Sequence, residues 1–229
     1  MSTQNGISIL GNDGKEIKSI QKLRYLGAIL SRDGRLDAEI NQKLWLAEQD
    51  FKTLSRVWQH TNISRGFKYQ ILDACIFQKL LYALEGAWLS KAFLKKLDSF
   101  QARCVRRILN VSHAFISRVS NKFCLREMGC TALSITLNQR QLQFYGHVAR
   151  QSEASSLRQS VFKGPDLTIK DMKLKRGRPR DTWIRRVHER AIQVAGGNIV
   201  QLEALVKDEK QWKVNIKTWF DNDGTNNLV

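Results

Sequence analysis

The stretch that decides the fold spans residues 90–110 and reads SKAFLKKLDSFQARCVRRILN. Its apolar side chains recur every three or four residues, which is the spacing of one face of an α-helix. Ser90 is a suitable N-cap, because its hydroxyl can accept a hydrogen bond from a backbone N–H of the first turn. The stretch therefore predicts a helix that ends near Asn110 and buries one face. The residues of that face are Leu94, Leu97, Phe100, Cys104 and Ile108.

The remaining surface of this predicted helix is basic. Its cations stand three or four residues apart or in adjacent pairs, so they can line a face that follows the phosphates of a nucleic acid. The alternative is an ordinary solvated face, since surface helices often carry Lys and Arg. The candidate phosphate-binding residues are Lys91, Lys95, Lys96, Arg103, Arg106 and Arg107.

Two further helices are predicted before this one. The first carries an apolar stripe with helical spacing, and the second begins after Ser64, a suitable N-cap. Because the connections between the three helices are short, we expect them to pack as a bundle over residues 36–110. The residues expected to face inward are Ile40, Leu44, Ala47, Phe51, Leu54 and Trp58 in the first helix, and Phe67, Ile71, Cys75 and Leu80 in the second.

The first 35 residues have a different pattern. Residues 7–10 and 15–20 read as short strands on either side of a GNDG turn, and residues 25–30 read as a third strand. Three short strands make a poor sheet on their own. We therefore expect residues 1–35 to be the β edge of a larger sheet.

Beyond residue 110 the sequence predicts a helical connector over 111–150, with one helix after Ser120 and another over 133–150. Residues 151–180 contain both prolines and lack an apolar period, which predicts a flexible basic linker. Thr182 can cap the first of the C-terminal helices expected over 181–220, and residues 221–229 are expected to be a frayed tail. The predicted fold class is mainly α: a helical bundle, a small β-hairpin or three-stranded piece before it, and a helical subdomain after it.

The charge of the chain is strongly positive and unevenly distributed. The formal net charge is +17, of which residues 61–180 carry +15. A polyanion would relieve the self-repulsion of such a chain and would release counterions on binding. Nucleic acid is therefore the favoured partner, and a merely soluble basic surface is the alternative.

The sharpest short motif is RGRPR at residues 176–180, which matches the core of an AT-hook. In that motif an extended backbone enters the narrow minor groove of DNA, and its arginines meet the negative potential there. The basic run over 173–180 is also a candidate nuclear-localisation signal, and an electrostatic linker is the third interpretation. The candidate nucleic-acid-binding residues of the run are Lys175, Arg176, Arg178 and Arg180.

Catalytic chemistry is poorly represented. Polymerases and nucleases need paired carboxylates for a metal, and Asp221 and Asp223 lie in a Gly- and Asn-rich tail with no strand to hold them. No glycine-rich phosphate loop occurs. We therefore predict no catalytic residues and no metal site, and the chain alone is not expected to be an enzyme.

Several segments together, and in this order, resemble the C-terminal part of the reverse transcriptase of LINE-type non-LTR retrotransposons. No single segment is specific, but their succession covers the chain from about residue 22 to residue 212. The segments are YLG (25–27), SRDG (31–34), LDAEI (36–40), NIS (62–64), LDSFQARCVRRIL (97–109), RVSN (118–121), YGHV (145–148), RGRPRDTW (176–183) and KDEKQW (207–212).

The resemblance implies roles for these segments. Tyr25, Leu26 and Gly27 would form the primer-grip turn that holds the primer 3′ end, and the three helices over 36–110 would form the thumb on the template–primer duplex. The fingers and the palm, with the paired aspartates that hold catalytic Mg²⁺, would precede residue 1. We expect a nucleic-acid-binding fragment of an RNA-directed DNA polymerase, with no cofactor unless a complete polymerase were present.

The expected partner is an RNA duplex, a DNA duplex or an RNA–DNA hybrid, and the missing fingers and palm are a further possible partner. The longest apolar stretch, residues 71–89, is interrupted by polar side chains, so no membrane span is expected. The basic run predicts a nuclear location, and a cytoplasmic one is expected otherwise. The alternatives are an AT-hook-like minor-groove DNA binder and a non-functional retrotransposon relic.

Overall fold

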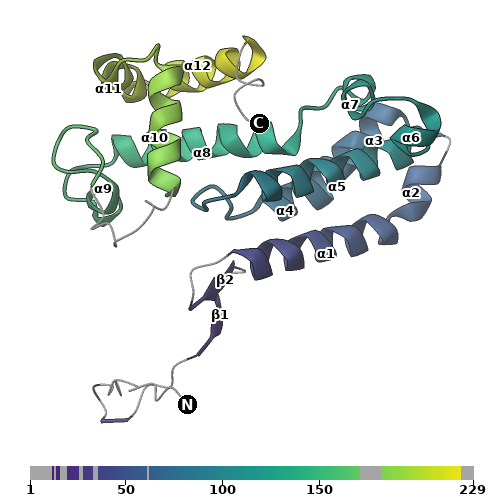
Figure 1. Cartoon of the computed structure of the whole chain (residues 1–229), viewed down its shortest axis with the longest axis horizontal. Helices are drawn as coiled ribbons and strands as arrows, with labels where there is room; N and C mark the ends of the chain where they lie inside the picture. Colours follow the sequence, from purple (N-terminus) through teal and green to yellow (C-terminus); the bar gives the residue numbers. More distant parts are fainter. Residues whose placement is uncertain are drawn as a thin grey trace. The chain divides into compact units, whose positions relative to one another are not determined.

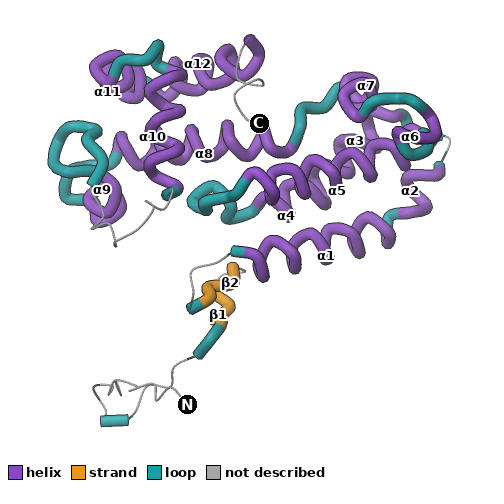
Figure 2. The backbone as a smooth tube through the Cα atoms, viewed as in Figure 1, coloured by secondary structure: helices purple, strands orange, loops and turns teal. Residues whose placement is uncertain are grey.

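The computed structural model describes residues 12, 14–15, 20–25, 28–32, 36–60, 62–170 and 182–222. These residues are mainly helical, with a small antiparallel sheet on the N-terminal side (Figures 1 and 2). The predicted fold class, mainly α with a small β-hairpin, is confirmed. The chain divides into two compact units, Met1–Gln42 and Lys43–Val229.

The described sheet of the N-terminal unit is a hairpin of β1 (Lys22–Tyr25) and β2 (Ala28–Ser31). Tyr25 pairs with Ala28, and Lys22 pairs with Ser31. The single strand predicted over residues 25–30 is therefore wrong, because the chain reverses between Tyr25 and Ala28. β-prone residues in both strands hid this pairing in the sequence. The strand predicted over 7–10 lies outside the described residues.

The first predicted helix is broken into two. α1 (Asp37–Thr53) ends where Leu54 begins α2 (Ser55–Gln59). Within Lys43–Val229 the inward stripe keeps Ala47 and Trp58 buried, whereas Phe51 is partly exposed. Because the helix is interrupted at Leu54, the predicted stripe does not lie along one face of a single straight helix.

The second predicted helix begins as expected, with the Ser64 hydroxyl accepting a hydrogen bond from the Phe67 backbone N–H at 3.2 Å. Its inward face is different, however, because Phe67 is 55% exposed and Cys75 is exposed, while Leu80 is buried as predicted. The buried stripe instead begins one residue after Phe67. It contains more large aliphatic side chains than the predicted stripe. Its residues are Lys68, Leu72, Ile76 and Leu80.

A π-helical turn lies within this predicted helix, after the buried face has already changed at Lys68 and Leu72. α3 (Arg65–Leu72) passes through η1 (Asp73–Phe77) into α4 (Gln78–Leu81). A π turn inserts an extra residue into the helix, so the buried positions after it are shifted relative to an unbroken α-helix. Both Ile76 and Phe77 are buried within the turn.

The third predicted helix is confirmed as α5 (Lys91–Leu109). The Ser90 hydroxyl accepts from the Phe93 N–H at 3.4 Å, and Asn110 ends the helix in the left-handed conformation with φ 57°. α5 packs against α2, α3, α7 (Asn121–Met128) and α8 (Leu133–Arg150). The helices up to residue 110 therefore share packing surfaces with the segment 111–150, rather than forming a bundle on their own.

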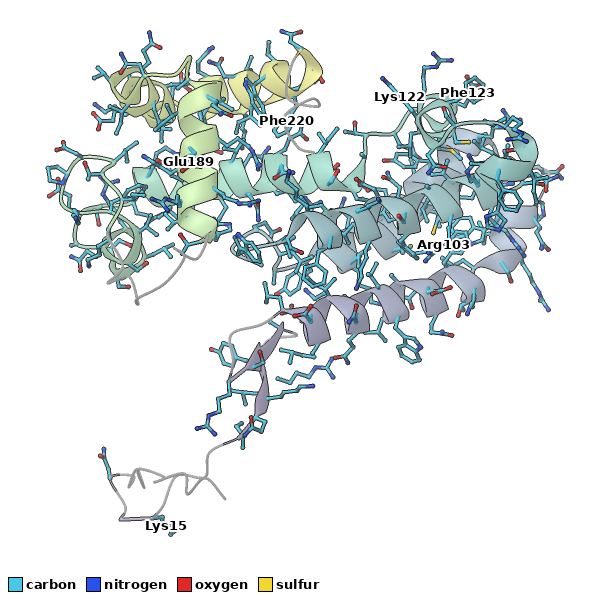
Figure 3. All side chains as sticks on the ribbon, viewed as in Figure 1. Lys15, Arg103, Lys122, Phe123, Glu189 and Phe220 are labelled. Atoms are coloured by element: carbon cyan, nitrogen blue, oxygen red, sulfur yellow. The ribbon has the colours of Figure 1, made fainter. Side chains whose placement is uncertain are left out.

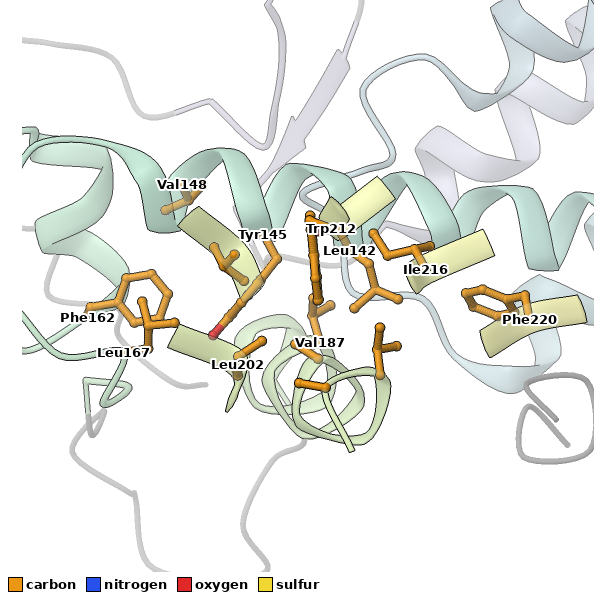
Figure 4. Packing of buried hydrophobic residues seen from close by; sticks show 14 residues of the cluster. Leu142, Tyr145, Val148, Phe162, Leu167, Val187, Leu202, Trp212, Ile216 and Phe220 are labelled. Carbon is orange, nitrogen blue, oxygen red and sulfur yellow. The ribbon is translucent and has the colours of Figure 1, made fainter. Parts of the chain in front are cut away.

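The C-terminal part of the larger unit is built around α8. α8 packs against α10 (Trp183–Val194), α11 (Ile199–Lys207) and α12 (Glu209–Asn222). Thr182 caps α10 as predicted, by accepting a hydrogen bond from the Arg185 N–H at 3.4 Å. Figure 4 shows the shared core, in which Tyr145 and Trp212 are fully buried.

Residues 151–170 are not the flexible linker that the sequence predicted. They contain α9 (Ser156–Val161), and Phe162 forms an antiparallel bridge with Ile169. Phe162 and Leu167 belong to the same core as Tyr145 (Figure 4). The segment lacks an apolar period because a few anchoring side chains, and not a continuous helical stripe, fix it to the protein. The rest of the predicted linker, residues 171–180, lies outside the described residues.

Candidate nucleic-acid interface

The exposed face of α5 carries most of the predicted phosphate-binding cations. Lys91, Lys95, Lys96, Arg103 and Arg107 are all exposed. Spacings of seven and four residues place Lys96, Arg103 and Arg107 on one side of the helix, because seven residues make about two turns. Lys91 and Lys95, four residues apart, form a second row.

Arg106 is not part of this face, so its predicted exposure is wrong. Only 6% of it is accessible to solvent. Its Nε donates to Asn121 Oδ1 at 2.8 Å, its Nη1 donates to the Ser112 carbonyl at 2.6 Å, and its Nη2 donates to the Val119 carbonyl. Arg106 therefore binds the connection between α5 and α7 and is not available to a phosphate.

The side of α5 that carries Arg106 is covered by another part of the chain. Ala102 lies one helical turn before Arg106 and is itself buried, at 4% exposure. A small residue one turn away allows another element to approach that side of the helix. The segment that contains α6 (Ala114–Ser117) contacts Arg106 on this side, through the carbonyls of Ser112 and Val119.

A groove of about 880 Å³ lies beside the exposed arginines. Its walls are residues 48–59, from α1 and α2, and residues 100–116, from α5 and the start of the following segment. Figure 3 shows Arg103 on the side of α5 that faces α1. Four cationic residues line the groove, Lys52, Arg103, Arg106 and Arg107, against one carboxylate, Glu48. The hydrogen bonds of Arg106 are already taken, so Lys52, Arg103 and Arg107 are the cations open to a ligand.

The floor of the groove is aromatic. Phe51 and Trp58 stack with ring centroids 5.2 Å apart and an interplanar angle of 15°. The Trp58 indole N–H donates to the Phe51 carbonyl at 2.8 Å. The Arg103 guanidinium lies 5.9 Å from the centroid of the Phe100 ring, a cation–π distance. Of these contacts, the one with the Phe100 ring restrains the Arg103 side chain.

The cations of the groove keep their charge available. In the part of the chain that the structure describes, neither Arg103 nor Arg107 is within ion-pair distance of a carboxylate. The one thiol in the groove, Cys104, is buried, and burial raises its pKa to about 12. It is therefore a neutral thiol near neutral pH and a poor nucleophile, so the groove fits binding better than covalent chemistry.

A second hollow, of about 690 Å³, is also lined by cations, but each of them forms an ion pair with a carboxylate. Arg150 lies 3.8 Å from Glu209, and Lys213 lies 2.5 Å from the same carboxylate. Arg140 lies 3.9 Å from Glu85. Because these cations already have carboxylate partners, an anion would have to compete for them, and the first groove is the better candidate.

The other predicted site residues belong to the N-terminal unit or lie outside the described residues. Tyr25 is 61% exposed at the end of β1, in the N-terminal unit. Leu26 and Gly27, and the four cations of the basic run, Lys175, Arg176, Arg178 and Arg180, lie outside the described residues. Lys52 was missed from the sequence, although it follows Phe51 of the predicted inward stripe.

Comparison with protein-family models, with curated proteins and with solved structures finds no match for this chain. Among the described residues no cluster of three or more His, Cys, Asp or Glu side chains is placed to hold a metal ion. No helix within the described ranges has the length and apolar character that crossing a lipid bilayer requires.

Proposed function

We propose that this protein binds nucleic acid through the groove between α1–α2 and α5, with phosphates held by Lys52, Arg103 and Arg107. The observation that carries the proposal is the pair of exposed arginines without carboxylate partners, in a groove of about 880 Å³. Residues 61–180, with a net charge of +15, add a long-range attraction for a polyanion.

The favoured ligand is a duplex read by its shape, such as an RNA–DNA hybrid or an RNA duplex. The order of segments that resembles the thumb of a LINE-type reverse transcriptase supports this choice. In that interpretation the protein is the duplex-binding part of an RNA-directed DNA polymerase, and the catalytic carboxylates belong to a palm outside this sequence. The proposed activity of the chain by itself is binding and not catalysis.

A second candidate is minor-groove DNA binding by the AT-hook-like run, which the RGRPR sequence at 176–180 favours. The two candidates differ in ligand preference. The groove predicts tolerance of sequence, whereas the run predicts a preference for A/T-rich DNA that disappears when Arg178 and Pro179 are replaced.

The decisive experiment is a salt titration of binding to an RNA–DNA hybrid and to A/T-rich and G/C-rich DNA duplexes, read by fluorescence anisotropy. Three neutralised phosphates predict a slope of log K against log salt of about −3 on DNA. Comparable affinities for the A/T-rich and G/C-rich duplexes, with tighter binding of the hybrid and a slope of that size, support the groove. A flat salt response would contradict the proposed function, and a strong A/T preference would favour the AT-hook alternative.

A further inference from the structure

A phenylalanine stands in solvent next to the basic groove. Phe115, on α6, is 74% exposed. Its ring lies nearly parallel to that of His113, with centroids 6.4 Å apart and an interplanar angle of 24°. His113 and Ile116 line the groove that also contains Arg103 and Arg107. Phe115 itself does not line the groove, but its ring neighbour His113 does, so His113 connects the exposed ring to the groove of the two arginines.

The segment that carries Phe115 is held in place from inside the protein. Arg106 donates hydrogen bonds to the carbonyls of Ser112 and Val119, which lie on either side of α6. The Ser117 hydroxyl, at the end of α6, accepts from Arg106 Nη1 at 3.4 Å and donates to the carbonyl of either Ser112 or His113, each at 3.1 Å. The exposed ring is thus presented by a backbone that a buried arginine orders.

We infer that His113 and Phe115 form a stacking platform for an unpaired base of the bound nucleic acid. The inference rests on the proposed function and adds that the bound nucleic acid contains an unpaired base. Every base has an aromatic face that can stack on a phenylalanine, and single-stranded segments are bound by aromatic side chains next to a cationic groove. The phosphates flanking the stacked base would meet Arg103 and Arg107. The ligand is then a duplex with a single-stranded overhang or a splayed end, and not a fully paired helix.

The positive charge of the groove favours a nucleic-acid strand over an apolar peptide as the ligand of this surface. Besides the internally bonded Arg106, the groove beside Phe115 and Ile116 holds three cations, Lys52, Arg103 and Arg107, against a single carboxylate. An apolar peptide would leave these charges without compensation, whereas a nucleic-acid strand supplies a phosphate next to each base. The surface therefore matches a ligand that alternates aromatic faces with negative charges.

The test compares a blunt duplex with the same duplex extended by a short single-stranded overhang that carries 2-aminopurine. The full chain should bind the overhang about tenfold more tightly than the blunt end, since one stacked base contributes about that factor. Stacking should also quench the 2-aminopurine fluorescence. Phe115→Ala should abolish both the added affinity and the quenching, and Phe115→Trp should retain them. Phe67→Ala, which removes an exposed phenylalanine with no groove-lining residue beside it in the sequence, is the matched control.

The outcomes separate this inference from the proposed function. Equal binding of blunt and extended duplexes, or an overhang preference that persists in Phe115→Ala, would overturn the stacking platform and leave duplex binding intact. Absence of salt-dependent binding to either ligand would overturn the proposed function, and the platform with it. Tighter binding of the overhang that only Phe115→Ala removes would support both.

Discussion

The hydroxyl of Tyr145 lies 2.8 Å from Nδ1 of His188, inside the core that joins α8 to α10. Both side chains are buried, and Tyr145 is fully so (Figure 4). Burial lowers the pKa of His188 below its usual value and raises that of Tyr145. The geometry therefore fits a neutral imidazole that accepts a hydrogen bond from the protonated phenol.

This pair predicts that the protein loses stability as the pH falls below about 6.5, the usual pKa of histidine in an unfolded chain. Because the folded-state pKa is lower, the unfolded state binds the proton first, and protonation then favours unfolding. The contribution is fully present above about pH 6.5 and is lost as the pH falls towards the folded-state pKa. Urea unfolding measured across this range should show the decline.

Two variants test the assignment. His188→Gln keeps a hydrogen-bonding side chain but cannot titrate, so the decline between about pH 7 and pH 5 should become smaller. Tyr145→Phe should lower stability by about 1 kcal/mol at neutral pH, because the histidine loses its partner, and should keep the pH dependence. An unchanged decline in His188→Gln would show that another group causes it.

Arg106 is buried and its neighbour Arg107 is exposed, so substitutions at the two positions test this difference in surroundings. Arg106→Lys cannot reproduce the hydrogen bonds to Asn121, Ser112 and Val119, so it should lower the free energy of unfolding by about 2 kcal/mol. Arg107→Lys, on the exposed side, should change it by less than about 0.5 kcal/mol. Equal effects in chemical denaturation would contradict the burial of Arg106.

Gly146 allows a close approach between α8 and α12. A Cβ atom there would meet the indole of Trp212 well inside van der Waals distance, and Trp212 Nε1 donates to the Leu142 carbonyl at 3.0 Å. Gly146→Ala should therefore destabilise the protein by about 1–3 kcal/mol, although alanine favours helices. Gly66→Ala, in α3, meets no atom within 4 Å and should be neutral or stabilising by up to about 1 kcal/mol. Thermal unfolding of both variants measures the contrast.

The double variant Arg103→Gln/Arg107→Gln should weaken binding to all duplex sequences to a similar extent. Its slope of log K against log salt should be smaller by about 2, because two phosphate contacts are lost. Lys210→Gln/Lys217→Gln removes the same charge from exposed positions on α12 and should have a much smaller effect. If both double variants weaken binding equally, net charge and not the groove determines affinity.

The local chemistry of the chain was readable from the sequence. The predicted caps Ser64, Ser90 and Thr182 each accept a hydrogen bond from a backbone N–H of the helix that follows, and so does Ser120, after which a helix was predicted. Gly129 ends α7 with φ +67°, as a C-terminal glycine does. Caps depend on a few neighbouring residues, so the starts of α3, α5, α7 and α10 could be predicted closely.

Contacts between segments that lie far apart in the sequence could not be predicted from neighbouring residues. From the sequence alone, Arg106 and Arg107 are equivalent cations on one helix. Only the approach of residues 112–121 buries the first and leaves the second in solvent. The same holds for residues 151–170, which look like a linker until Phe162 and Leu167 enter the core.

The sequence by itself determined the helical class, the helix ends and the excess of positive charge, because these follow from local hydrogen bonding, apolar spacing and composition. Tertiary structure decided which stripe of α3–α4 is buried, which arginine faces solvent, and that Lys52 shares a groove with Arg103. Those outcomes depend on which surfaces far apart in the chain exclude water together, and a single helix pattern does not contain that information.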